Sequence, residues 1–193
     1  MDTALDVVII DPSPSVIAER ERLGLDGRDE VWDGEYHMVP AASNEHQRLE
    51  LELALALHPI ALRAGLVLRF EVGLYAPAST GLRNFRVPDL VIYRPHIGSA
   101  RGVEGPASLV IEIGSPGDES FEKLPHYEQF GVGEVLIIDR DTKGIRHWVL
   151  VDGVLTERPG RPVGHHHLTC LPVTVATDAG TLVVTTPHAT TRI

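Results

Sequence analysis

The segment from Ser108 to Asp139 constrains the fold more than any other part of this 193-residue chain. Two apolar runs, SLVIEI and EVLIID, flank the helix-like sequence DESFEKLPHYEQF, which ends just before Gly131. Runs that are apolar throughout are typical of strands buried on both faces. Because two strands joined through a helix usually pair in parallel, the segment predicts a parallel strand pair inside a sheet.

Other segments predict one long helix, further strands and two hairpins. The helix is expected to begin with Asn44 as its N-cap and to end before Gly65. Strands are expected over residues 66–75, where apolar residues alternate, and over residues 87–93. Asp-Gly pairs at 33–34 and 152–153 predict tight hairpins. The predicted fold class is α/β (α+β), a mixed β-sheet flanked by helices, with extra β-hairpins.

Length and composition predict one compact domain. A chain with 43% hydrophobic residues can bury one good-sized core. We expect an N-terminal arm over residues 1–28, with a short helix and no assigned chemistry, and a domain over residues 29–193. The single cysteine, Cys170, excludes an internal disulfide and a thiolate zinc site. With no apolar leader and no run of about 18 apolar residues, we expect a cytoplasmic protein without membrane contact.

The charge of the chain bears on its partners. The formal net charge is -10, and non-specific binding to nucleic acid or to an anionic membrane depends mainly on neutralising phosphates. An acidic chain is poorly suited to such binding, although a local basic groove is compatible with it. Two of the 17 basic residues are lysine, Lys123 and Lys143, and the others are arginine. Because arginine supplies the other positive charges, we ask whether each lysine has a role that arginine could not fill.

Two carboxylates, Asp89 and Glu112, lie among the apolar runs. Side chains alternate along a strand, so Glu112 shares a face with Val110 and points inward. Asp89 opens the preceding strand, where it can lie close to Glu112 across the sheet. Buried carboxylates are costly unless a cation compensates them, and two carboxylates, a backbone carbonyl and waters suit Mg²⁺. The structural alternative is that Asp89 caps a turn and Glu112 pairs with an arginine.

Lys123 is the third element of this candidate site. Arginine stays protonated, whereas a desolvated lysine near a metal can shift its pKa and help to activate or orient a water. On a helix, Lys123 and Tyr127 are four residues apart and share a face, so both can point at the strand ends. Lys143 lies in a turn and needs no such role. The alternative for Lys123 is a solvated residue paired with Glu119 or Glu122.

These residues together resemble a known family. The motifs PDLVIY, LVIEIGSP, a helix with Lys123, and FGVGEVLIID are similar to those of the Uma family of restriction-endonuclease-like proteins, within the PD-(D/E)XK nuclease superfamily. The E-x-x-D-G-E element from Glu30 to Glu35 and a helix with His46 resemble the family's opening segment. Gly114 stands where the general superfamily motif has lysine, and Lys123 matches the displaced lysine of the Uma arrangement.

The resemblance spans about residues 29–140 and implies a restriction-endonuclease-like domain that hydrolyses DNA phosphodiester bonds with Mg²⁺ or Mn²⁺. The implied catalytic residues are Asp89, Glu112 and Lys123. Metal ligands would be Asp89, Glu112 and the carbonyl of Ile113. Accessory residues would be Glu30, His46 and Tyr127. Phosphate contacts are expected from Arg83, Arg86 and Arg94, for which surface solvation is the alternative.

Two other functions are compatible with the sequence. The first is a catalytically inactive module that keeps the nuclease fold for binding or regulation, which the acidic net charge favours. The second is a transition-metal protein built on the run from His165 to His167. Neighbouring residues of a strand point to opposite sides, so only His165 and His167 could chelate one ion. A homodimer is left open.

Overall fold

The computed structural model describes residues 7–9, 12–24, 26–39, 41–75, 84–115, 117 and 119–193. Its central feature is a six-stranded sheet with the strand order β12-β11-β10-β9-β7-β4. The strands are β4 (Val67–Phe70), β7 (Leu90–Tyr93), β9 (Leu109–Gly114), β10 (Glu134–Asp139), β11 (Ile145–Val151) and β12 (Val154–Glu157). Strands β9 and β10 pair in parallel, as predicted, and the other neighbours are antiparallel.

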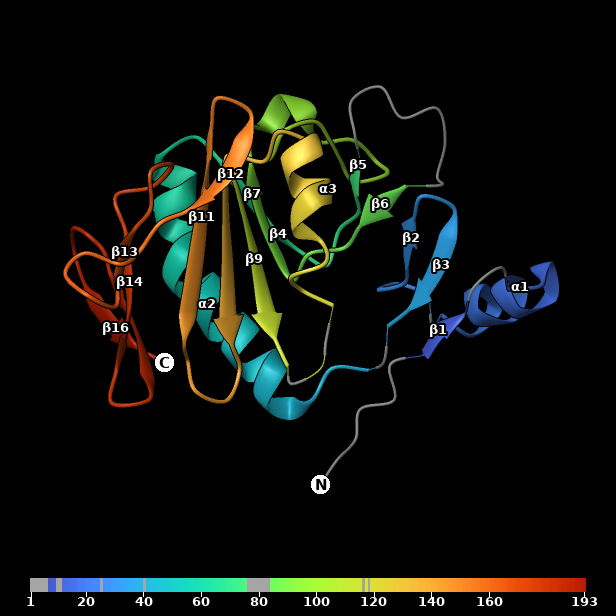
Figure 1. The fold of residues 1–193 in the computed structure, drawn as a ribbon, viewed down its shortest axis with the longest axis horizontal. Helices are drawn as coiled ribbons and strands as arrows, with labels where there is room; N and C mark the ends of the chain where they lie inside the picture. The colour runs from blue at the N-terminus through green and yellow to red at the C-terminus, as the bar shows by residue number, and fades with distance from the viewer. Residues whose placement is uncertain are drawn as a thin grey trace.

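Two helices cover opposite faces of this sheet (Figure 1). Helix α2 (Asn44–Arg63) packs its buried leucines against the face that carries Leu109, Ile111 and Ile113. Helix α3 (Leu124–Gln129) covers the other face, where Val110 belongs to a second apolar cluster. The predicted alternation of side chains along β9 is therefore confirmed, and it places Glu112 on the α3 side.

A second sheet, at the N-terminal side, has the strand order β1-β3-β2-β6-β5-β8. Its strands are β1 (Val7–Ile9), β2 (Glu30–Trp32), β3 (Glu35–Met38), β5 (Leu74–Tyr75), β6 (Phe85–Arg86) and β8 (Val103–Glu104). Helix α1 (Pro14–Leu23) precedes β2, and the 3-10 helix η1 (Pro95–Ile97) precedes β8. The predicted hairpin between β2 and β3 is confirmed: Asp33 and Gly34 have φ of 50° and 99°, which a two-residue turn of this kind requires.

The C-terminal residues form a third sheet beside α2 (Figure 1). Its strands are β13 (His165–His167), β14 (Thr174–Asp178), β15 (Thr181–Thr185) and β16 (Thr190–Arg192). Apolar residues of this sheet, including Val175, Leu182 and Val184, belong to the same cluster as the buried face of α2. The helix is thus packed between two sheets. The second predicted hairpin, β11–β12 with Asp152 and Gly153 at its turn, is also confirmed.

The strand predicted over residues 66–75 is two strands in different sheets. Strand β4 pairs with β7 in the central sheet, whereas β5 pairs with β6 and β8 in the N-terminal sheet. Glu71 interrupts the run with φ of 44°, and its N–H donates to the carbonyl oxygen of Asp89 at 3.1 Å. The alternating pattern continues through this break, so the pattern alone does not reveal it.

Two helix boundaries also differ from the prediction. The N-cap of α2 is Ser43, whose Oγ accepts a hydrogen bond from the N–H of His46 at 3.2 Å, and Asn44 is the first helical residue. The predicted helix over residues 118–130 is shorter, because α3 begins only at Leu124 and residues 120–123 form turns. Pro125 lies in its first turn, where a missing N–H costs nothing. No helix within the described ranges is long and apolar enough to span a membrane.

We predict that Glu134→Ala lowers the free energy of unfolding by about 3 kcal/mol, because it leaves buried donors without an acceptor. Glu134 is 1% exposed and accepts hydrogen bonds from His147 Nε2 at 3.1 Å and from the N–H groups of Thr169 and Cys170 at 2.7 and 2.8 Å. These bonds join β10 to the loop before β14. Urea unfolding measures the loss. Glu157→Ala, which removes an exposed ion pair, is the control and should change stability by less than about 1 kcal/mol.

Candidate active site

The two predicted carboxylates lie across from each other on neighbouring strands. Leu90 of β7 pairs with Ile111 of β9, which sets Asp89 opposite Glu112 in the antiparallel register. Val91 and Val110 belong to the cluster beneath α3, so alternation places both carboxylates on that face. Asp89 and Glu112 are only 3% and 2% exposed. The sheet thus brings two acidic side chains into its interior on one side.

Every carboxylate oxygen of Asp89 has a donor from the protein. Oδ1 accepts from Arg28 Nη2 at 2.8 Å and hydrogen-bonds His46 Nε2 at 2.9 Å, while Oδ2 accepts from the N–H of Ile113 at 2.6 Å. Burial favours the neutral acid, but the hydrogen bond and charge of His46, with Arg28, hold the pKa of Asp89 below its usual value. Asp89 is therefore an ionised carboxylate between two cationic or polar side chains.

Glu112 is held on the other side by α3 and the turn before it. Lys123 Nζ lies 3.3 Å from Oε1 and 3.4 Å from Oε2 of Glu112, and the Tyr127 hydroxyl donates to Oε1. Burial raises the pKa of Glu112 to about 8. The positive charge of Lys123 opposes this shift, and the negative charge of Asp89 adds to it. The helical spacing of Lys123 and Tyr127 brings both side chains to one carboxylate. The predicted alternative of an arginine pair is found at Asp89 rather than at Glu112.

Lys123 also reaches a third carboxylate, that of Glu30 on β2. The Nζ–Oε1 distance is 2.8 Å, and Glu30 is fixed by the N–H of Val87 at 2.8 Å and by Trp32 Nε1 at 2.6 Å. Burial alone would lower the pKa of Lys123, but the charges of Glu112 and Glu30 outweigh it and raise that pKa. Two buried carboxylates thus stabilise the charged form of Lys123, and its pKa beside a bound metal stays a prediction.

The second lysine and the arginines singled out in the sequence have other surroundings. Lys143, for which no special role was expected, is also buried, and its ammonium pairs with Glu45 of α2 at 3.0 Å. Arg86 is 4% exposed and donates to the carbonyl oxygen of Val31, whereas Arg94 is exposed. Arg83 lies outside the described residues. Phosphate contacts by these arginines stay predictions.

The histidines from His165 to His167 form β13 in the C-terminal sheet, away from the carboxylates (Figure 1). Both ring nitrogens of His167 have hydrogen-bond partners, the Thr174 hydroxyl at 2.8 Å and the Arg161 carbonyl oxygen at 3.0 Å. Among the residues that the structure describes, no group of three or more His, Cys, Asp or Glu side chains is arranged to hold a metal ion. An ion at the Asp89–Glu112 pair would need water as additional ligands.

Sequence reasoning missed one contact of the site. Arg28, at the end of the predicted arm, donates to Asp89 and also pairs with Glu71 at 3.0 Å. No motif marks Arg28, since it lies in a charged stretch that reads as a solvated surface. The β2–β3 hairpin follows Arg28, and its position beside the central sheet brings the Arg28 side chain to Asp89.

Comparisons with known proteins gave a family match and a structural match. A model of the Uma2 family, described as "Putative restriction endonuclease", matches residues 18–175. Among solved structures, the chain is similar to one described as a putative nuclease belonging to DUF820 from Anabaena variabilis ATCC 29413, with a TM-score of 0.53 and 15% sequence identity. That likeness covers 68% of this chain and 77% of the other, and it confirms the predicted fold class. No match was found among curated proteins.

We predict that Tyr127→Phe raises the pKa of Glu112 above its value of about 8, because the hydroxyl of Tyr127 stabilises the ionised carboxylate. A ¹³C NMR titration of the glutamate carboxyl carbons, with Glu112 assigned by its own substitution, measures the shift. Tyr93→Phe removes a hydroxyl from the same apolar cluster and serves as the control. An unchanged or lower pKa in Tyr127→Phe would show that the hydroxyl does not support the charge.

Proposed function

Since the chain belongs to the Uma2 family, we propose that it is an endonuclease that hydrolyses DNA phosphodiester bonds with the help of a bound divalent metal ion. Membership confirms the resemblance seen in the sequence. The observation that carries the proposal is the buried pair Asp89 and Glu112 on adjacent strands, with the ammonium of Lys123 beside Glu112. Two carboxylates and a lysine on one side of a sheet supply both the ligands and the cation that phosphodiester hydrolysis needs.

The donor set fits Mg²⁺ or Mn²⁺ in its chemistry. Carboxylate oxygens are hard ligands, and Mg²⁺ is usually held by one or two carboxylates with several waters. Burial and the charge of Asp89 both disfavour ionisation of Glu112, and a divalent cation between the two carboxylates would relieve that repulsion. Asp89 and Glu112 would hold the ion together with the carbonyl of Ile113, the third ligand that the family resemblance implies.

When bound, the metal would polarise the phosphate and lower the pKa of a water ligand. The ammonium of Lys123 lies beside Glu112, where it would donate a hydrogen bond that orients the attacking water and stabilises negative charge on the phosphate. Glu30 positions the ammonium through its 2.8 Å ion pair. His46 positions Asp89 through the bond to Oδ1.

DNA is the proposed substrate because the family description names a restriction endonuclease. The chain has a net charge of -10, so backbone contacts must come from local arginines rather than from an overall attraction. Arg94 is exposed one residue after β7, at the opposite end of that strand from Asp89, and is proposed for such a contact from the sequence. Arg83 is proposed for the same role from the sequence alone.

A second candidate is a binding or regulatory module without turnover. The donors around Asp89 favour it, since Arg28, His46 and the Ile113 N–H already occupy three of the roughly four acceptor positions of the carboxylate. An ion bound at the remaining position would lie close to the positive charge of Arg28, and the two cations would repel each other. The two candidates therefore differ in whether Asp89 releases Arg28.

We predict that Lys123→Arg and Lys123→Ala lose most plasmid-nicking activity but keep metal binding. Arginine preserves the charge, but its larger planar head cannot occupy the space between Glu30 and Glu112. Nicking with Mg²⁺ or Mn²⁺ is compared at one fixed salt concentration, because salt changes DNA binding.

Asp89→Ala is the reference for a protein that lacks the metal site, and Arg192→Lys, a charge-preserving change in an exposed ion pair, is the matched control. Wild-type activity in Lys123→Arg would remove the proposed role of Lys123. Absence of nicking by the wild-type protein with either metal would favour the module without turnover.

We predict that Arg28→Gln binds Mn²⁺ several-fold more tightly than the wild-type protein. The guanidinium of Arg28 pairs with Asp89 Oδ1 and places a positive charge next to the proposed ion, so its removal weakens the competition for that oxygen. Electron paramagnetic resonance of free Mn²⁺ gives the affinity. Arg20→Gln, which breaks a neighbouring pair with Asp29, controls for a general loss of charge. Equal or weaker binding by Arg28→Gln would contradict a competition at Asp89.

A further inference from the structure

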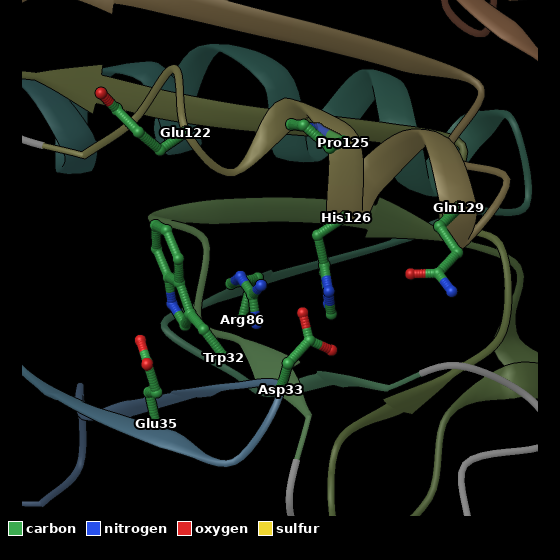
Figure 2. A pocket seen from close by; sticks show the side chains of 8 residues that line it. All are labelled: Trp32, Asp33, Glu35, Arg86, Glu122, Pro125, His126 and Gln129. Carbon is green, nitrogen blue, oxygen red and sulfur yellow. The ribbon is translucent and has the colours of Figure 1, made fainter. Parts of the chain in front are cut away.

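A pocket of about 420 Å³ lies between α3 and the β2–β3 hairpin (Figure 2). Its lining residues are Trp32, Asp33, Glu35, Arg86, Glu122, Pro125, His126 and Gln129. Figure 2 shows the side chain of His126 pointing from α3 toward Arg86 and Asp33 across this space. The volume is within the range of pockets that enclose small organic ligands.

Two buried polar side chains that line this pocket have atoms without a hydrogen-bond partner. Arg86 and His126 are each 4% exposed, and neither Arg86 Nε nor His126 Nε2 has a partner among the described residues. His126 hydrogen-bonds the backbone of Leu74, and burial with the charge of Arg86 lowers its pKa to about 3, so the ring is neutral. Arg86 Nε therefore offers a donor and His126 Nε2 an acceptor. Buried polar atoms of this kind are rare unless a ligand or water completes them.

The charges around the pocket determine what it can hold. Asp33, Glu35 and Glu122 contribute three carboxylates at its rim, against the single guanidinium of Arg86. This balance disfavours a phosphate or another anion. The guanidinium lies over the Trp32 ring, 4.3 Å from its centroid, and forms a planar wall. The pocket thus suits an uncharged, planar ligand that both donates and accepts hydrogen bonds along its edge.

We propose that this pocket binds a nucleobase. Arg86 Nε–H would donate to a ring nitrogen or keto oxygen of the base, while His126 Nε2 and the rim carboxylates would accept from its amino or ring N–H groups. The base comes either from a free nucleoside or from a nucleotide that is extruded from DNA, as in enzymes that flip a base out of the helix.

The position of the pocket favours the extruded base. Trp32 lines the pocket and donates through Nε1 to Glu30, and Glu30 pairs with Lys123. A base in the pocket would thus lie one side chain away from the residues that act on the phosphate. This source of the base rests on the proposed nuclease function, whereas binding of a nucleobase as such does not.

The first experiment measures binding of free nucleosides to the wild-type protein by titration calorimetry without metal. Guanosine, adenosine, cytidine and thymidine are compared with ribose 5-phosphate, which has a charge but no base. We expect at least one nucleoside to bind and ribose 5-phosphate not to bind. Gln129→Trp, which fills the pocket from an exposed position, and His126→Leu, which removes the acceptor, should each weaken nucleoside binding at least tenfold.

Matched controls separate the pocket from general effects. Val163→Trp adds a tryptophan at a residue that is 96% exposed, and His165→Leu replaces an exposed histidine of β13. Both should bind nucleosides as the wild-type protein does. Because Gln129 is exposed, Gln129→Trp tests the inference even if His126→Leu fails to fold.

The second experiment uses a DNA duplex with 2-aminopurine in a mismatch, which lowers the energy of unpairing. In the presence of EDTA, the 2-aminopurine fluorescence should rise with the wild-type protein and with Val163→Trp, but not with Gln129→Trp. Nucleoside binding without this rise overturns the extruded base and leaves a free nucleoside as the occupant. No nucleoside binding to the wild-type protein overturns the inference altogether, and plasmid nicking measured separately decides whether the nuclease function still stands.

Discussion

The ammonium of Lys123 between the carboxylates of Glu30 and Glu112 is the interaction on which the site depends. It joins β2 of the N-terminal sheet to β9 of the central sheet through the turn before α3. A buried charge that loses its partner costs several kcal/mol, so these three residues hold one another in place. Trp32 and Tyr127 donate hydrogen bonds to the same two carboxylates, those of Glu30 and Glu112.

The network explains why the N-terminal hairpin belongs to the site. Glu30 is on the first strand of that hairpin, and Arg28 precedes it by two residues and reaches Asp89. Asp89 and Glu112 therefore each receive a cation from a different direction: Asp89 from the chain before β2, and Glu112 from the turn before α3. Metal binding would alter the first of these pairs and keep the second.

Much of the fold and the site could be predicted from the sequence, because strong local patterns mark the elements concerned. The parallel pair β9–β10 follows from two apolar runs around a helical segment, and both Asp-Gly hairpins follow from their turn chemistry. Alternation along β9 placed Glu112 on the inner face, and helical spacing brought Lys123 and Tyr127 to it.

The features that could not be predicted depend on contacts between distant segments. Residues 66–75 keep their alternation while the chain passes from one sheet to another, so the break at Glu71 has no signal in the pattern. Arg28 lies in a charged stretch without a motif. Glu30 approaches Lys123 from a separate sheet and adds to the effect of Glu112 in raising the pKa of Lys123, which spacing on one helix cannot show.

Anomalous X-ray diffraction from crystals grown with Mn²⁺ would show whether Asp89 and Glu112 share a divalent ion. We expect one strong manganese peak within bonding distance of both carboxylates, with Arg28 moved away from Asp89 Oδ1 and Lys123 still between Glu30 and Glu112. A peak only at other residues, such as His165 to His167, or an Asp89 that keeps Arg28 at saturating Mn²⁺, would contradict this expectation.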